Sequence, residues 1–215
     1  MRLLYQFPTS VFSRRTRLAL AHKGLDCELR DARRDAAAGE EMRRLNPLAT
    51  APVLVDDDRV IGDSTAIAAY LDVVYPDSPA LVPRARDAGY HATRVVSQID
   101  LAMNTLADVG TRYYALRNDP AWADVSSNKI RRAQAAIDAV TAHAAGRVHL
   151  AGDAWSIADI WAYSAATWVA GMPARAKDNV LVAQILTLGF VMPDALVAWA
   201  KQHDGRADVR SVYGS

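Results

Sequence analysis

Short apolar runs alternate with amphipathic stretches along the first eighty residues of the chain. Apolar runs that end at Pro, Gly or Asp are typical of strands, whereas apolar positions three or four residues apart are typical of helices. In chain order we predict strand 2–6, helix 11–23, strand 25–30, helix 36–45, strands 52–55 and 59–61, and a helix from 64 to 71. The order is therefore βαβ followed by ββα. Its first half requires a parallel pair of strands with a right-handed crossover, and its second half a hairpin with a covering helix.

The pattern changes after a proline-containing stretch at residues 76–79, beyond which the chain is helical almost throughout. Turn residues divide this region into five or six predicted helices, and no strand is predicted. Proline-containing polar segments are typical of domain boundaries. We therefore predict an α/β domain at residues 1–78, a linker at 79–86 and an all-α domain at 87–215.

Composition narrows the class of protein. The 215 residues include 25 Lys and Arg against 24 Asp and Glu, and 51% of them are hydrophobic. This balance is typical of a globular chain with a sizeable core and argues against nucleic acid as a partner. We predict no membrane span and a cytoplasmic location, because no run of 18 apolar residues occurs and the apolar start is too short for a signal peptide. The single cysteine, Cys27, excludes an internal disulfide and a zinc site built on paired thiolates.

Three segments carry recognisable motifs: residues 10–20 (SVFSRRTRLAL), 46–54 (NPLATAPVL) and 63–71 (DSTAIAAYL). A fourth, residues 156–159 (SIAD), has the form of a capping box with Asp in its last position. In this order, the four segments resemble those of the cytosolic glutathione S-transferase superfamily, serine-type. The resemblance covers essentially the whole chain. It implies a thioredoxin-like first domain and glutathione as co-substrate, with no metal, and it gives the capping box a structural role.

Ser10 is the candidate catalytic residue. It follows a predicted strand and opens a predicted helix. A hydroxyl there can donate a hydrogen bond to a thiolate, and the positive end of the helix dipole favours the same charge. The resemblance implies that Ser10 contacts the thiol of glutathione, whereas its position alone also suits a simple helix cap. Tyr5, at the end of the strand, and Ser13 are alternative hydroxyls, and Tyr5 fits strand packing better.

A thiol–disulfide exchanger would need a reactive cysteine, and Cys27 is poorly placed for that role. It lies between Asp26 and Glu28, whose charges disfavour a thiolate, and it is far along the chain from Ser10. A small, half-buried apolar residue is the better interpretation.

The other two motifs imply contacts with the peptide part of glutathione. If the Ala51–Pro52 bond is cis, as the resemblance implies, the backbone of Ala51 can pair with the cysteinyl backbone of the ligand. Ser64 and free backbone N–H groups at a helix start suit the γ-glutamyl carboxylate, and Asp63 suits the ammonium group. Asp63 and Ser64 also suit a helix cap.

One feature departs from the family pattern. Ala49 and Thr50 stand where relatives often have Gly followed by Lys or Gln. The glycyl carboxylate is then left to Thr50 or to a basic residue such as Arg14 or Arg34.

Residues of the predicted helical domain offer a second-substrate pocket. Met103, Leu106, Gly110 and Tyr114 share one helix face, which in the family lines that pocket, although core packing is the more frequent explanation of such a stripe. Asp100 is either a residue that reaches a neighbouring subunit's ligand or a solvated charge. The end of the chain at residues 212–213 either covers the pocket or frays.

The sequence therefore predicts a glutathione transferase, acting as a homodimer, that binds glutathione and a small hydrophobic electrophile. Isomerisation, dehalogenation and peroxide reduction use the same thiolate and stay open. The alternative is a non-catalytic binding or assembly module of the same fold, which the Ala49-Thr50 segment would favour.

Overall fold

The computed structural model describes residues 1–214, which form two compact units. The first contains residues 1–84 together with residues 204–214, and the second contains residues 85–203. Each unit is built around its own hydrophobic core.

The first unit contains a four-stranded mixed sheet with the order β2-β1-β3-β4. Its strands are β1 (Arg2–Gln6), β2 (Glu28–Asp31), β3 (Val53–Asp56) and β4 (Arg59–Gly62). β1 pairs in parallel with β2 and antiparallel with β3, which in turn pairs antiparallel with β4. The predicted parallel pair and hairpin are therefore confirmed.

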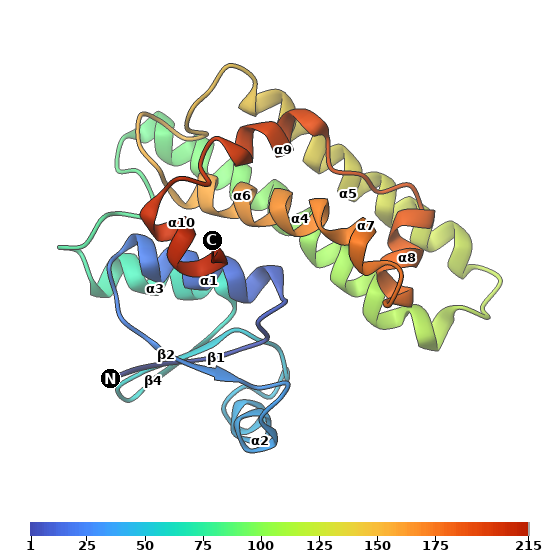
Figure 1. The fold of residues 1–215 in the computed structure, drawn as a ribbon, viewed down its shortest axis with the longest axis horizontal. Helices are drawn as coiled ribbons and strands as arrows, with labels where there is room; N and C mark the ends of the chain where they lie inside the picture. The colour runs from blue at the N-terminus through green and yellow to red at the C-terminus, as the bar shows by residue number, and fades with distance from the viewer. Residues whose placement is uncertain (215) are drawn as a thin grey trace. The chain divides into compact units, whose positions relative to one another are not determined.

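Helices cover both faces of this sheet, with α1 (Val11–His22) and α3 (Ser64–Val74) on one side and α2 (Ala36–Leu45) on the other (Figure 1). Side chains of successive strand residues point to opposite faces. Tyr5 and its cross-strand partner Val53 pack with residues of α2, and their neighbours Leu4 and Leu54 are fully buried on the opposite face. The first unit is thus the three-layer, thioredoxin-like α/β arrangement that was predicted.

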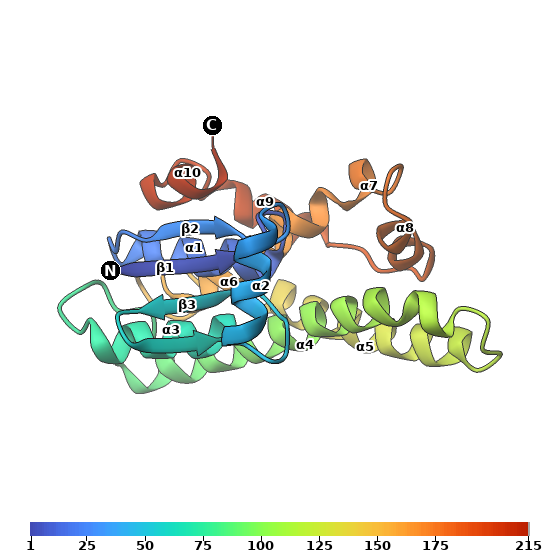
Figure 2. The ribbon, with the colours of Figure 1, turned by 90° about the horizontal axis from the view of Figure 1, so that it is seen from below.

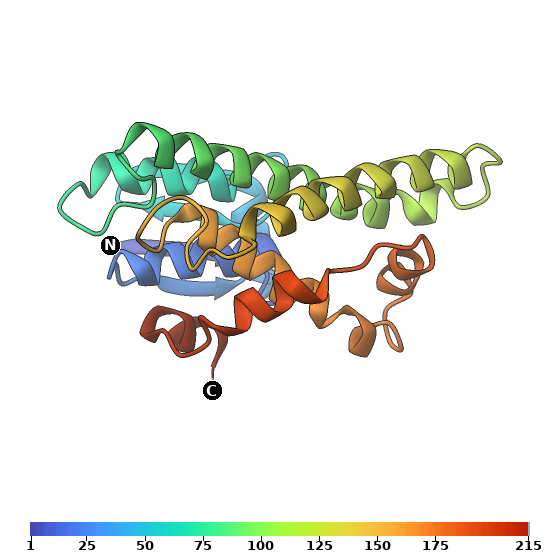
Figure 3. The same cartoon turned by 90° about the horizontal axis from the view of Figure 1, so that it is seen from above.

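The chain beyond the sheet is helical. Within the described residues these helices are α4 (Arg86–Leu116), α5 (Trp122–Ala144), α6 (Ile157–Ala170), α7 (Met172–Arg175), α8 (Val180–Thr187), α9 (Asp194–Lys201) and α10 (Ala207–Tyr213). The long α4 and α5 run side by side (Figure 3). α6 is buried on nearly all sides, which is typical of the central helix of a bundle.

Several element boundaries differ from those expected. β2 begins at Glu28, so Cys27 lies just before the strand rather than inside it. Seven helices, rather than five or six, follow residue 84 in the described chain, because turns at Gly171 and residues 176–179 separate two short ones. The last of them, α10, packs with the first unit, whereas the sequence-based division placed residues 87–215 in one helical domain.

None of the helices in residues 1–214 is long and apolar enough to cross a membrane.

Candidate functional site

Ser10 lies at the junction of β1 and α1, where it is the N-cap residue of the helix. Its backbone is extended (φ −75°, ψ 132°), and its N–H donates to the carbonyl of Phe7 at 2.9 Å. The Ser10 hydroxyl makes no capping hydrogen bond to the helix. Simple capping therefore does not explain this side chain, which stands at the positive end of the helix dipole.

The loop before Ser10 is held from α1 at two points. Ser13, which is fully buried, accepts a hydrogen bond from the N–H of Phe7 at 3.2 Å. The Nε–H of Arg14 donates to the carbonyl of Pro8 at 3.2 Å. Ser13 is thus a structural anchor for the loop, and the guanidinium of Arg14 is placed beside it.

The two rival groups of the first unit are both poorly suited to thiol chemistry. Tyr5 is 6% exposed in the core beneath α2, where burial raises the pKa of its phenol. Burial also raises the pKa of the Cys27 thiol, to about 11, so that it is protonated at neutral pH. These environments favour a packing role for Tyr5 and an unreactive thiol at Cys27.

The segment before β3 has a specific backbone form. The Ala51–Pro52 peptide bond is cis, and Ala49 has a φ of 53°, in the left-handed region that favours glycine. Asn46 donates from Nδ2 to both the carbonyl and the hydroxyl of Thr50, at 2.9 and 3.1 Å. Asn46 therefore fixes Thr50 in place, a role of Asn46 that the sequence pattern did not indicate.

The start of α3 is built around a buried arginine. Arg15 and Ser64 are each 1% exposed, and the Ser64 oxygen accepts hydrogen bonds from Nε and Nη2 of Arg15 at 3.0 and 2.7 Å. A hydroxyl oxygen has two lone pairs, and the two bonds from Arg15 occupy both of them. The O–H of Ser64 is therefore available to donate a hydrogen bond. The guanidinium also adds positive charge behind the helix terminus. Both features favour an anion at this point.

Asp63 acts as the N-cap of α3, with a φ of 70°. Its Oδ1 accepts from the N–H groups of Thr65 and Ala66 at 2.7 and 3.1 Å. The capping function that the sequence left open for Asp63 is therefore confirmed, while the capping function for Ser64 is not, because Ser64 is bound to Arg15.

Arg15 was missed because three arginines in one helix look like a solvated basic face. The missed signal is its spacing: Val11, Arg15 and Leu18 stand at i, i+4 and i+7 on one stripe, which is buried throughout. A charged residue on an apolar stripe indicates a buried partner.

The predicted second-substrate residues separate into two environments. Met103, Leu106 and Gly110 are buried in the second unit, whereas Tyr114 is 59% exposed. Tyr114 belongs to the last turn of α4, where its ring meets that of Tyr113 edge-on. Their burial differs, and the second-substrate pocket stays a prediction.

A groove of about 550 Å³ opens on a neighbouring face of α4. It is lined by Ser97, Asp100, Leu101, Asn104, Thr105, Asp108 and Lys129. Asp100 accepts a hydrogen bond from Nε1 of Trp161 at 3.2 Å, and Asp108 is paired with Lys129 at 2.7 Å. Asp100 is therefore tied to the central helix of its own unit.

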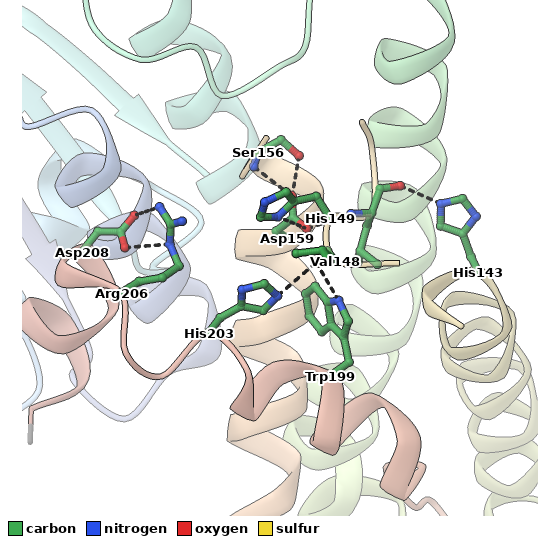
Figure 4. A network of polar contacts seen from close by, with 10 residues as sticks. His143, Val148, His149, Ser156, Asp159, Trp199, His203, Arg206 and Asp208 are labelled. Carbon is green, nitrogen blue, oxygen red and sulfur yellow. Dashed lines mark hydrogen bonds and ion pairs between the residues drawn. The ribbon is translucent and has the colours of Figure 1, made fainter. Parts of the chain in front are cut away.

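The capping box at the start of α6 is present as predicted, and it organises a polar network inside the second unit (Figure 4). Oδ2 of Asp159 accepts from the N–H and the hydroxyl of Ser156, both at 2.9 Å, and Oδ1 accepts from the N–H of Leu150 at 2.8 Å. Asp159 is fully buried, and this burial raises the pKa of its carboxyl despite these bonds. The motif joins the preceding loop to the core helix.

Comparisons with known proteins agree with this architecture. The profile of the family described as "Glutathione S-transferase, N-terminal domain" matches residues 4–79. Glutathione S-transferase Z1 of Arabidopsis thaliana is 34% identical over 167 residues, 74% of this chain and 72% of the relative.

Solved structures show the same fold. A glutathione S-transferase from Methylobacterium radiotolerans, in complex with glutathione sulfonate, superimposes with a TM-score of 0.74 at 22% identity, covering 98% of this chain and 93% of that one. A rice glutathione S-transferase in complex with glutathione gives a TM-score of 0.67 at 25% identity, covering 98% and 89%. With its sheet order, its helical second unit and these relatives, the chain belongs to the glutathione S-transferase family.

Proposed function

We propose that this protein is a glutathione transferase in which Ser10 stabilises the glutathione thiolate. The observation that carries the proposal is the Ser10 hydroxyl, which stands at the start of α1 and is not used to cap that helix. No acidic residue lies in the first turn of α1, so the positive end of the helix dipole is not neutralised there.

The hydroxyl of Ser10 donates a hydrogen bond to the sulfur and thereby lowers the pKa of the bound thiol. The thiol proton passes to solvent, and the thiolate electron pair forms the new bond to an electrophilic carbon. A leaving group departs with its bonding electrons, or a double bond accepts them where the reaction is an addition. Ser10 itself keeps its proton throughout.

Groups on three segments hold the peptide. The backbone of Ala51 pairs with the cysteinyl residue in the manner of an added strand. The O–H of Ser64, oriented by Arg15, donates to the γ-glutamyl carboxylate, and Asp63 faces the ammonium group. Thr50 or Arg14 receives the glycyl carboxylate.

We expect a small hydrophobic electrophile as second substrate, a homodimer as the working form and a cytoplasmic location. The face that carries Met103, Leu106, Gly110 and Tyr114 remains our candidate for binding the electrophile, and the groove beside Asp100 on α4 is a further concave surface of the same unit.

Calorimetry with glutathione tests the proposal on the full chain and three variants: Ser64→Ala, Ser10→Ala and, as a control, Thr93→Ala, which removes a hydroxyl from the exposed side of α4. We expect binding to weaken about tenfold in Ser64→Ala, since a hydrogen bond to a charged group is lost. Binding should be nearly unchanged in Ser10→Ala and in the control. The absence of any heat at millimolar glutathione would contradict the proposal.

The non-catalytic alternative makes a different prediction. A binding module would show no turnover of an activated aryl chloride, and Ser10→Ala would then change nothing that can be measured. Ala49 and Thr50, the two residues that depart from the family pattern, would favour this alternative; Ala49 has a left-handed backbone, and Thr50 is held by Asn46.

A further inference from the structure

The last helix, α10, packs against α1 within the first unit (Figures 1 and 2). α10 has seven residues, and a helix of this length is not stable in water without tertiary contacts. Its position therefore depends on what it touches.

Three side chains of α1 contact α10 along its length. His22 Nδ1 lies 3.4 Å from Asp208 Oδ2, Arg17 Nη2 donates to the carbonyl of Val212 at 2.8 Å, and the Arg14 guanidinium lies over the Tyr213 ring at 5.6 Å. The two helices run in opposite directions, so the end of α10 meets the beginning of α1. Ser10 is the N-cap residue just before that beginning.

Charges at both ends of α10 set this direction. Asp208, in its first turn, is bound by His22. It is also paired with Arg206 (Figure 4). Burial alone would raise the pKa of the Asp208 carboxyl, but these hydrogen bonds hold it far below its ordinary value. At the other end Arg17 satisfies a carbonyl of the last turn, where the helix dipole is negative. The reversed orientation would lose both interactions.

Arg14 connects the end of α10 to the catalytic loop. Its guanidinium contacts the Tyr213 ring, and its Nε–H donates to the carbonyl of Pro8, two residues before Ser10. A cation over an aromatic face is held there by the ring quadrupole. Without the ring, Arg14 regains rotamer freedom and the Pro8 carbonyl loses a fixed donor.

We propose that Tyr213 is a positioning residue for the reaction: by holding Arg14 against the Pro8 carbonyl, it sets the place of the Ser10 hydroxyl relative to the glutathione sulfur. This inference rests on the proposed function. It gives the C-terminal helix a part in the chemistry of the first unit.

The test compares Tyr213→Leu, which loses the aromatic face, with Tyr213→Phe, which keeps it. Arg210→Ala, on the exposed side of α10, is the matched control. With glutathione and an activated aryl chloride, we expect kcat to fall roughly tenfold in Tyr213→Leu, because small misplacements of reacting groups are costly. The pKa of the bound thiol, followed by its ultraviolet thiolate absorbance, should rise. Tyr213→Phe and the control should stay within about twofold of the unchanged chain.

A second readout needs no ligand and separates this inference from the proposed function. The N–H of Ser10 is bonded to the Phe7 carbonyl, so its hydrogen exchange reports the order of the loop. We expect exchange roughly tenfold faster in Tyr213→Leu and unchanged in Tyr213→Phe. If Tyr213→Leu does not fold, Arg14→Lys removes the bond to Pro8 and reports on the same contact.

Equal rates of hydrogen exchange at the Ser10 N–H in Tyr213→Leu and in Arg210→Ala would overturn the inference. So would faster exchange with an unchanged kcat and thiol pKa. If the unchanged chain binds no glutathione, the proposed function fails, and the exchange readout alone then decides whether Tyr213 orders the loop.

Discussion

Ser10 and Ser156 are both N-cap residues of helices, and their hydroxyls are used in opposite ways. The Ser156 hydroxyl and N–H both donate to Asp159, three residues on, and both residues are buried. The residue three positions after Ser10 is Ser13, whose oxygen turns back to Phe7 instead. The Ser10 hydroxyl therefore makes no capping bond, and no acid neutralises its helix terminus. A serine at a helix start thus either joins a capping network or stays out of one, and in these two helices the side chain three residues later differs accordingly.

The largest effect that would sharpen this comparison is the loss of the acid in the structural motif. In Asp159→Ala, the N–H groups of Leu150 and Ser156 lose their acceptor in a buried place. We expect a loss of roughly 3 kcal/mol in the free energy of unfolding, since each buried donor left unsatisfied costs about 1 kcal/mol or more. Chemical denaturation measures it, and a loss below about 1 kcal/mol would contradict the assigned role.

Ser10→Ala should have the next largest effect, and only on chemistry. Removing one hydrogen-bond donor to a developing or stabilised charge costs about a hundredfold in rate. We expect this loss in kcat with glutathione and an activated aryl chloride, together with a higher pKa of the bound thiol. Ser13→Ala is not a matched control, because it frees the loop, whereas Thr93→Ala removes an exposed hydroxyl of α4 and leaves the first unit intact. Full activity of the Ser10→Ala variant would contradict the proposed mechanism.

The two serines should differ in stability as well, by a smaller amount. Replacing an N-cap serine that makes its bonds costs about 1 kcal/mol, so Ser156→Ala should lose about that much. Ser10→Ala should lose less than about 0.5 kcal/mol, since no capping bond is present to be removed. Thermal or denaturant unfolding of the two variants side by side checks the difference. Equal losses would break the comparison.

The smallest expected effect is a dependence on pH. Burial raises the pKa of Asp159 in the folded state above its unfolded value of about 4. The folded state therefore holds this proton more tightly, and the contribution of Asp159 to stability falls as pH rises from about 4 through the folded pKa. Asp159→Asn removes this titration. The free energy of unfolding of the unchanged chain, minus that of Asp159→Asn, should therefore fall as pH rises above about 4. A rise of this difference with pH would contradict burial as the cause of the raised pKa.

Much of the fold could be predicted because its signals are local. The limits of β1 and α2 follow from apolar runs and from turn residues that end them, and the βαβ-ββα order then leaves few topologies. The capping box at Ser156 was visible in four letters of sequence. Boundaries failed where a run was ambiguous, as at Cys27, which alternates with Leu25 and Leu29 in a strand-like pattern but precedes the strand.

Parts of the candidate site depended on contacts that no local pattern contains. Arg15 meets Ser64 across 49 residues of sequence, and Asp208 meets His22 at an even greater separation. Tyr114 was grouped with Met103 by helical spacing, yet only Met103 is buried, because burial depends on what packs against each turn of the helix.

The sequence by itself determined the fold class, the order of elements, the family and the place of Ser10 at the start of a helix, since periodicity, capping and turn residues act over a few positions. Only the tertiary structure decided that the Ser10 hydroxyl makes no capping bond, that the Ser64 oxygen is occupied by Arg15, and that the last helix lies against α1. The physical reason is that burial, hydrogen bonding and charge pairing depend on which residues are neighbours in space. Folding brings such neighbours together from distant parts of the sequence.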